Sequence, residues 1–511
     1  MSNYRDPVSR PTPRSDLEGV LREQEARLDP AREGAVHRQA ERGLSTARAN
    51  IDALIDRGSF VEYGGLARPV HPEMDGPADG LVMGTAQVDG HGVVVMAYDF
   101  TVYGGTQSAT NHRKMSRMFS LAERNRWPVV GWWDGGGART HDLVVPGRPE
   151  SDGFVTFARL SGLVPTVAVV TGRAFAGQAN LTGLCDFSVA TRRAAMGMAG
   201  PPLVESALGI RYRPEEIGPM TVHEAAGAVD LVVDTEGQAI ESARAYLRYF
   251  RGPRTAGAAP DTFALRDVVP ENPRRAYNVR KVVEGICDEG DWLELRPKFG
   301  RAAVTGLGRI GGYPVAIIGN QPMHLAGAMD SDACDKIARF IGLADAYDLP
   351  LVFLVDTPGL MVGPEVEKTA LVRHSARILT AAANATVPFM TVVLRKAYGL
   401  GYYVLGALAY EPDLLVAWPT AEFGGMGLEG AASILYKEEL KAAPDEDARR
   451  ALHHERTMAL RAAHTPLGVA GRFHIDDVID PADTRAKLLA TLQAIPVPPA
   501  RKHRKRTVEP W

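Results

Sequence analysis

Two neighbouring stretches of sequence decide the fold of this chain: Leu351-Val-Phe-Leu-Val-Asp-Thr-Pro-Gly-Leu-Met-Val-Gly363 and Phe389-Met-Thr-Val-Val-Leu-Arg-Lys-Ala-Tyr-Gly-Leu-Gly401. Each begins with an apolar run and ends in a turn rich in glycine, which predicts a buried strand that stops at an open loop. Glycines at strand ends allow ligand atoms to approach main-chain N–H groups. The two stretches therefore predict two buried strands, each followed by a loop whose main chain a ligand can approach.

The first half of the chain carries a second copy of this arrangement. Gly84 recurs as Gly306, and Asp134 recurs as Asp356 at the same offset along the chain. The apolar positions of one amphipathic helical pattern keep this offset, with Met115, Met118, Phe119 and Ala122 in the first half and Ile337, Phe340, Ile341 and Ala344 in the second. A constant offset through strand, helix and loop predicts two copies of one domain.

An insertion distinguishes the two copies near their beginnings. The motif Asp56–Glu62 recurs as Asp288–Glu294, and this offset is ten positions longer than the one that relates Gly84 to Gly306. The difference predicts extra sequence in the first copy. We place this insertion within His71–Gly80.

Each copy alternates predicted strands with helices. The predicted strands are Val93–Ala97, Val129–Trp133 and Val167–Thr171 in the first copy, and Val315–Gly319, Leu351–Asp356 and Phe389–Leu394 in the second. Continuous apolar strands separated by helices are typical of an α/β sheet that is covered on both faces. We predict an N-terminal domain over residues 1–260, including a helical segment from Ser15 to about Ile55, and a C-terminal domain over residues 261–511. A linker composition at Gly252–Pro260 marks their join.

Composition excludes several classes of protein. A length of 511 residues, with 45% hydrophobic and 23% charged residues, is typical of a globular protein with two large domains. The net charge of −3 argues against nucleic-acid binding. Single, scattered cysteines (Cys185, Cys287 and Cys334) fit a reducing compartment. Without a long apolar run or a signal-peptide pattern, we predict a cytoplasmic protein that does not bind a membrane. The basic tail Arg501–Arg506 is predicted to be a solvated end.

Two glycine-rich loops in the first copy indicate chemistry. They are Asp134-Gly-Gly-Gly-Ala-Arg139 and Gly172-Arg-Ala-Phe-Ala-Gly-Gln178. Two backbone N–H groups that converge on one point form an oxyanion hole, which stabilises an enolate or alkoxide oxygen. A tight turn without a ligand is the alternative. Comparable loops at matching places in both copies favour the oxyanion hole. The sequence contains no His-Glu-x-x-His pattern, so we predict no metal site.

Several motifs carry a resemblance to a known family. The chain resembles the carboxyltransferase (beta) subunits of biotin-dependent acyl-CoA carboxylases, members of the crotonase-like (ClpP/crotonase) superfamily. The resemblance runs from about Arg42 almost to the C-terminus. It rests on the motifs Asp99–Gly105, Asp134–Arg139, Val269–Pro273, Asp356–Gly363, Arg395–Gly399, Ala417–Thr420 and Ile475–Pro481.

The resemblance implies a fold and a reaction. The fold is two tandem crotonase-like domains, each a covered sheet with surrounding helices. In the family, the acyl-CoA lies on the N-terminal domain of one subunit and carboxybiotin approaches from the C-terminal domain of another. The carboxyl group moves to the α-carbon of the acyl-CoA through an enolate. The implied partners are a separate biotin carboxyl carrier, a biotin carboxylase and further copies of the chain in a hexamer.

The resemblance also implies roles for individual residues. Gly136 and Gly137 would hold the thioester enolate, and the N–H groups of Leu400 and Gly401 would hold the biotin carbonyl oxygen. The other expected contacts are Gly135, Ala138, Arg139, Ala176, Gly177, Gln178 and Tyr403 for the substrate and Gly359, Tyr398 and Gly399 for biotin.

The chain departs from the family pattern at two loops. Gly399-Leu400-Gly401 stands where the family usually has Gly-Gly-Ala, and Gln178 lies in a loop that is usually small and apolar or aromatic. These departures motivate an alternative, a biotin-independent decarboxylase or another enzyme that processes acyl thioesters. A non-enzymatic partner in a larger carboxylase is the least favoured reading, because the loop Asp134–Arg139 is intact.

Overall fold

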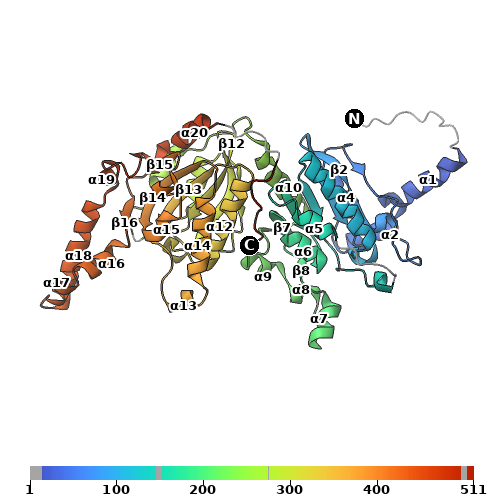
Figure 1. Cartoon of the computed structure of the whole chain (residues 1–511), viewed down its shortest axis with the longest axis horizontal. Helices are drawn as coiled ribbons and strands as arrows, with labels where there is room; N and C mark the ends of the chain where they lie inside the picture. Colours follow the sequence, from blue (N-terminus) through green and yellow to red (C-terminus); the bar gives the residue numbers. More distant parts are fainter. Residues whose placement is uncertain (1–13, 145–151, 274, 497–502) are drawn as a thin grey trace. The chain divides into compact units, whose positions relative to one another are not determined.

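The computed structural model describes residues 14–144, 152–273, 275–496 and 503–511, which form two compact units (Figure 1). The first unit contains the chain up to Leu160 together with Val164–Thr221 and Val232–Arg244. The second contains Ser161–Leu163, Val222–Leu231 and Ala245–Trp511. The division predicted at residue 260 remains a prediction, and residues 245–260 group with the second unit. Residues 1–13 of the predicted N-terminal domain lie outside the described ranges.

The first unit is built on a seven-stranded sheet of order β1-β2-β3-β4-β5-β7-β9. Its strands are β1 (Val61–Glu62), β2 (Leu81–Val88), β3 (His91–Tyr98), β4 (Val129–Trp132), β5 (Thr166–Val170), β7 (Phe187–Thr191) and β9 (Leu231–Val233). Strands β1 to β3 pair antiparallel, whereas β3, β4, β5 and β7 pair parallel. The small strands β6 (Arg173–Phe175) and β8 (Ala195–Gly197) pair separately.

The second unit repeats this order in an eight-stranded sheet, β10-β11-β12-β13-β14-β15-β17, with β16 paired to β14. Its strands are β10 (Trp292–Leu295), β11 (Ala303–Ile310), β12 (Tyr313–Asn320), β13 (Leu351–Thr357), β14 (Phe389–Tyr398), β15 (Leu414–Ala417), β16 (Glu422–Gly424) and β17 (Asp477–Val478). Strand β14 is longer than predicted because Lys396–Tyr398 pair with β16.

Helices flank both sheets (Figure 1). In the first unit they are α1 (Ser15–Ala26), α2 (Glu33–Glu41), α3 (Ala47–Leu54), α4 (Ala109–Asn125), α5 (Asp152–Ala158), α6 (Gly177–Gly183), α7 (Pro201–Leu208) and α8 (Pro214–Ile217). Helices α9 (Met220–Ala225) and α10 (Glu236–Arg248) include residues of both units. In the second unit they are α11 (Arg280–Ile286), α12 (Ser331–Ala346), α13 (Pro364–Glu367), α14 (Leu371–Ala383), α15 (Gly399–Tyr403), α16 (Leu428–Leu435), α17 (Lys437–Lys441), α18 (Glu446–Ala463), α19 (Pro466–Ala470) and α20 (Thr484–Ala494).

The predicted duplication is confirmed at the level of individual contacts. The ion pair between Arg48 and Glu62, at 2.9 Å, recurs between Arg280 and Glu294, at 2.5 Å, with the longer of the two offsets. Helices α4 and α12 begin at positions that are related by the shorter offset. The change of offset between these features places the inserted sequence between Glu62 and α4, a range that contains the predicted His71–Gly80.

Each unit also buries one lysine at the same place. The Lys114 ammonium donates to the carbonyl oxygen of Leu81 at 2.5 Å, and its counterpart Lys336 donates to that of Ala303 at 2.8 Å. Burial lowers the pKa of Lys114 to about 8 and that of Lys336 to about 7. Both lysines thereby hold the segment that leads into the second strand of their sheet.

The prediction that the basic C-terminal tail is a solvated end is wrong for the part of the tail that the structure describes in contact with the protein. The residues from Lys505 onward are not a solvated end, because they pack on the second unit. The Lys505 side chain is only 8% exposed and pairs with Asp345. The Trp511 indole donates to Asp335 at 3.0 Å. Carboxylates on α12 thus hold the tail, which sequence patterns did not show. Residues 501 and 502 of the predicted tail lie outside the described ranges.

Candidate functional site

Two short helices begin at matching places in the two units. Helix α6 begins at Gly177, and α15 begins at Gly399, which are related by the same offset as α4 and α12. The N–H groups in the first turn of a helix have no acceptor within that helix. No side chain caps α6 or α15. Each helix start therefore offers backbone donors to a ligand oxygen.

The glycine loop of the first unit lies beside the start of α6. Gly135 pairs with β6, since its N–H donates to Arg173 and its carbonyl accepts from Phe175. A Cβ placed on Gly137, whose φ is +87°, would lie 2.9 Å from the Ala176 Cβ. The loop and the residue that precedes α6 are therefore in direct contact.

Internal hydrogen bonds engage the two amides that were expected to hold the enolate. The Gly136 N–H donates to the Gly104 carbonyl at 3.1 Å. The Gly137 N–H donates to the Gln178 side-chain oxygen at 2.9 Å. By contrast, the N–H groups of Ala138 and Gly177 donate to no atom of the described residues.

Gln178 connects three parts of the first unit. Its side chain is fully buried. While its oxygen accepts from Gly137, its amide nitrogen donates to the Gly105 carbonyl at 2.6 Å. Both polar ends are thus used inside the protein, which gives a structural reason for a polar residue at this unusual position.

The remaining predicted residues of the first unit divide between surface and interior. Ala138 is exposed and Ala176 half-buried, whereas the side chain of Arg139 is buried and pairs with Asp79. Sequence reasoning missed Asp79, although the predicted insertion contains it.

In the second unit, Gly401 is tightly packed. A Cβ at this position would lie 2.5 Å from the Gly359 Cα, so the backbone of the facing loop leaves room for glycine alone. Leu400 is 47% exposed and Tyr403 is 54% exposed. The Tyr398 hydroxyl is turned inward and donates to Glu422 at 2.8 Å.

Each unit has a buried aspartate at the carboxyl end of an equivalent strand, β4 in the first unit and β13 in the second. Asp134 follows β4 and accepts from the Thr171 hydroxyl at 2.8 Å and the Gly172 N–H at 3.0 Å. Asp356, in β13, accepts from Arg395 at 3.1 Å and from the Lys396 N–H at 3.2 Å. Each carboxylate thereby fixes the segment that leads to α6 or α15.

We expect Asp134→Asn to change the pH dependence of unfolding. Burial raises the pKa of Asp134 to about 6, against about 4 in an unfolded chain. Its contribution to stability is therefore fully present below about pH 4 and is lost as the pH rises through about 6. Urea unfolding of both proteins should show the stability of the wild type, relative to the variant, falling by about 1 kcal/mol from pH 5 to 8. A difference that does not change with pH would contradict the assignment.

The described residues contain no group of three or more His, Cys, Asp or Glu side chains placed to hold a metal ion. Within the same residues, no helix is both long and apolar enough to cross a membrane.

Known proteins are similar to this chain in sequence and in fold. Residues 38–508 match the family described as the carboxyl transferase domain. The biotin-dependent long chain acyl-coenzyme A carboxylase beta4 subunit of Mycobacterium tuberculosis is 34% identical, with 93% of each chain covered. Among solved structures, a single-chain, multi-domain long-chain acyl-CoA carboxylase is 42% identical with a TM-score of 0.88. The match covers 94% of this chain and 49% of that one. The transcarboxylase 12S hexamer, solved with methylmalonyl-coenzyme A bound, is 32% identical with a TM-score of 0.86, covering 97% and 98%.

The chain therefore belongs to the carboxyl transferase domain family. Its enzyme class is that of the carboxyltransferase subunits of acyl-CoA carboxylases. The expected fold class, two tandem crotonase-like domains, is confirmed by the two structural matches.

Proposed function

We propose that this protein is the carboxyltransferase component of an acyl-CoA carboxylase and moves a carboxyl group from carboxybiotin to the α-carbon of an acyl-CoA. The observation that carries this proposal is the pair of uncapped helix starts at Gly177 and Gly399, one in each unit. The reaction needs two sets of backbone donors, one for a thioester oxygen and one for a biotin carbonyl oxygen. Membership of the carboxyl transferase domain family indicates that the group transferred is a carboxyl group.

The first unit is proposed to hold the thioester. The N–H groups of Ala138 and Gly177 are its oxyanion donors, because neither has an acceptor among the described residues. Gly136 and Gly137 set the path of the loop through their internal hydrogen bonds. Donors held in place before the reaction stabilise the developing enolate charge without reorganisation.

The second unit is proposed to hold biotin, which arrives on a separate carrier protein. The first-turn N–H groups of Leu400 and Gly401 fit a carbonyl oxygen, because no side chain caps this helix. When bound, carboxybiotin supplies the carboxyl group and a basic nitrogen for the α-proton. The departure at Leu400 changes a side chain and leaves the backbone donors in place, so it does not favour the biotin-independent alternative.

Further copies of the chain are proposed to complete the assembly. Exposed apolar side chains occur on α7 and on α16, at Leu203 and Leu208 and at Ile434 and Leu435. The homologous 12S protein forms a hexamer. We propose that these two helices contact a second copy. A cytoplasmic location stays a prediction.

Turnover of carboxyacyl-CoAs tests the proposed function. The purified chain is incubated with malonyl-, methylmalonyl- and longer carboxyacyl-CoAs, with and without a biotinylated carrier domain. We expect decarboxylation of at least one thioester only when the carrier is present, and sedimentation of the protein as an oligomer. Decarboxylation that is independent of biotin would establish the alternative function. Absence of turnover in folded, oligomeric protein would also contradict the proposal.

A further inference from the structure

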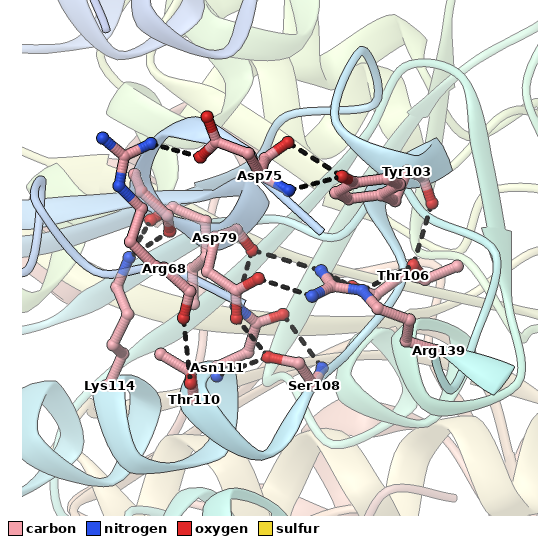
Figure 2. Close-up of polar contacts among 12 residues, drawn as sticks. Arg68, Asp75, Asp79, Tyr103, Thr106, Ser108, Thr110, Asn111, Lys114 and Arg139 are labelled. Carbon is pink, nitrogen blue, oxygen red and sulfur yellow. Dashed lines mark hydrogen bonds and ion pairs between the residues drawn. The ribbon is translucent and has the colours of Figure 1, made fainter. Parts of the chain in front are cut away.

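The first unit contains a buried ion pair close to its glycine loop. The Arg139 guanidinium lies 2.5 Å from a carboxylate oxygen of Asp79, and their side chains are 1% and 0% exposed. Figure 2 shows Arg139 pointing from its loop toward Asp79. Arg139 also donates to the carbonyl oxygen of Thr106 at 3.1 Å. The arginine is therefore directed into the protein and away from any substrate on the loop surface.

The Asp79 carboxylate is held from a second side. Its other oxygen accepts from the Ser108 hydroxyl and from the Asn111 amide, the latter at 3.2 Å (Figure 2). Ser108 and Asn111 form the capping box of α4. The carboxylate thus joins the glycine loop to the N-terminus of α4, an end of a helix that favours negative charge.

The backbone around Asp79 adopts a conformation that its surroundings impose. Ala78 and Asp79 have φ values of +52° and +50°, which non-glycine residues rarely adopt. The Lys114 ammonium donates to the Ala78 carbonyl at 2.6 Å. Such a backbone persists when the surrounding contacts determine it, and it often occurs beside functional sites.

The second unit lacks this ion pair. At the offset that relates Gly84 to Gly306, Asp79 and Arg139 correspond to Arg301 and Met361. Asp79 also belongs to the segment that contains the insertion of the first copy. The ion pair and the inserted segment are therefore features of the thioester-binding unit alone, whereas the buried lysine is common to both units.

We propose that Asp79 and Arg139 are positioning residues that hold the Ala138 N–H in place for the thioester oxygen. Arg139 follows Ala138 directly, and its own N–H donates to the Gln107 carbonyl at 2.7 Å. Side chain and backbone of Arg139 thus fix the end of the loop. This inference rests on the proposed function and replaces the expected substrate contact of Arg139 with a supporting role.

The kinetics of Asp79→Asn, Arg139→Lys and the double variant test the proposal. We expect each single variant to lower kcat for carboxyl transfer by about 100-fold, because a small displacement of a donor has an effect of this size. KM for the acyl-CoA should change by less than about threefold, since the ground-state contacts of the substrate remain. The double variant should be no slower than the slower single variant, because both changes release the same loop. A higher KM in Arg139→Lys alone, or additive losses in kcat, would overturn the proposal.

Hydrogen exchange supplies a reading that does not depend on activity. The amides of Gly136 and Gly137 should exchange faster with solvent in both single variants than in the wild type. If Asp79→Asn does not fold, Arg139→Lys alone provides the measurement. Unchanged exchange in a folded variant would overturn the positioning role, whether or not the wild type is active. Inactivity of the wild type alone would refute the proposed function and leave the positioning role standing.

The matched control is Arg485→Lys in the second unit. Arg485 forms a comparable buried ion pair with Asp288, at 2.6 Å. We expect this variant to leave exchange of the glycine loop and kcat unchanged. Equal losses in kcat from the control would show that any buried ion pair has this effect, and would overturn the specific role of Asp79 and Arg139.

Discussion

Gly137→Val is expected to abolish measurable carboxyl transfer. The φ of Gly137 is +87°, a region that a β-branched residue does not adopt without strain. The new Cβ would lie 2.9 Å from the Ala176 Cβ, so the loop must move away from the start of α6. Displacing or removing one oxyanion donor lowers kcat by roughly 100- to 1,000-fold. Steady-state assays with the biotinylated carrier measure this loss.

Gly183→Ala is the control for this variant. Gly183 lies in the same helix α6, and a Cβ there would meet no heavy atom within 4 Å. This variant should keep wild-type turnover, and thermal unfolding should show that both proteins are folded. If folded Gly137→Val retains activity within a few-fold of the wild type, the glycine loop has no part in the reaction.

The family usually has alanine at the position of Gly401, but in this chain the facing loop leaves no room for a methyl group. Gly401→Ala is therefore expected to remove the biotin-dependent step while leaving the thioester site intact. The added methyl group would lie 2.5 Å from the Gly359 Cα and 2.8 Å from its carbonyl carbon. These are backbone atoms, and the Gly359 N–H is itself tied to the Thr357 hydroxyl at 3.1 Å. The start of α15 must therefore shift, and with it the donors to the biotin carbonyl. We expect kcat to fall by about 100-fold, since misplacement of about 1 Å has this effect.

Calorimetric titration with an acyl-CoA separates the two sites in this variant. The dissociation constant of Gly401→Ala for the acyl-CoA should match the wild-type value, because the thioester is proposed to bind the first unit. The control is Gly425→Ala, at a position where a Cβ would meet no heavy atom within 4 Å. Undiminished carboxyl transfer in Gly401→Ala, or a loss of its affinity for the acyl-CoA, would contradict the assignment of the thioester to the first unit and of biotin to the second.

The fold was largely predictable because its signals are repeated along the chain. The predicted strand Val129–Trp133 differs from β4 by one residue, and Leu351–Asp356 differs from β13 by one residue. Apolar runs that end in glycine mark buried strands regardless of their neighbours. Strand β14 was predicted four residues too short, because its end at Tyr398 depends on pairing with β16, a partner distant in sequence.

The sequence by itself determined that this protein is a duplicated α/β chain with matched glycine loops, since periodicity and offset are properties of a one-dimensional pattern. Only the tertiary structure decided which backbone N–H groups and side chains at those loops are free to contact a ligand and which are engaged inside the protein. Gln178 engages the Gly137 N–H, and Arg139 turns inward to Asp79. Both contacts join residues that are distant in sequence, and the direction of a side chain or an amide depends on such partners. That is why the glycine loop itself was visible in the sequence, whereas the contacts of Arg139 and Gln178 required the folded chain.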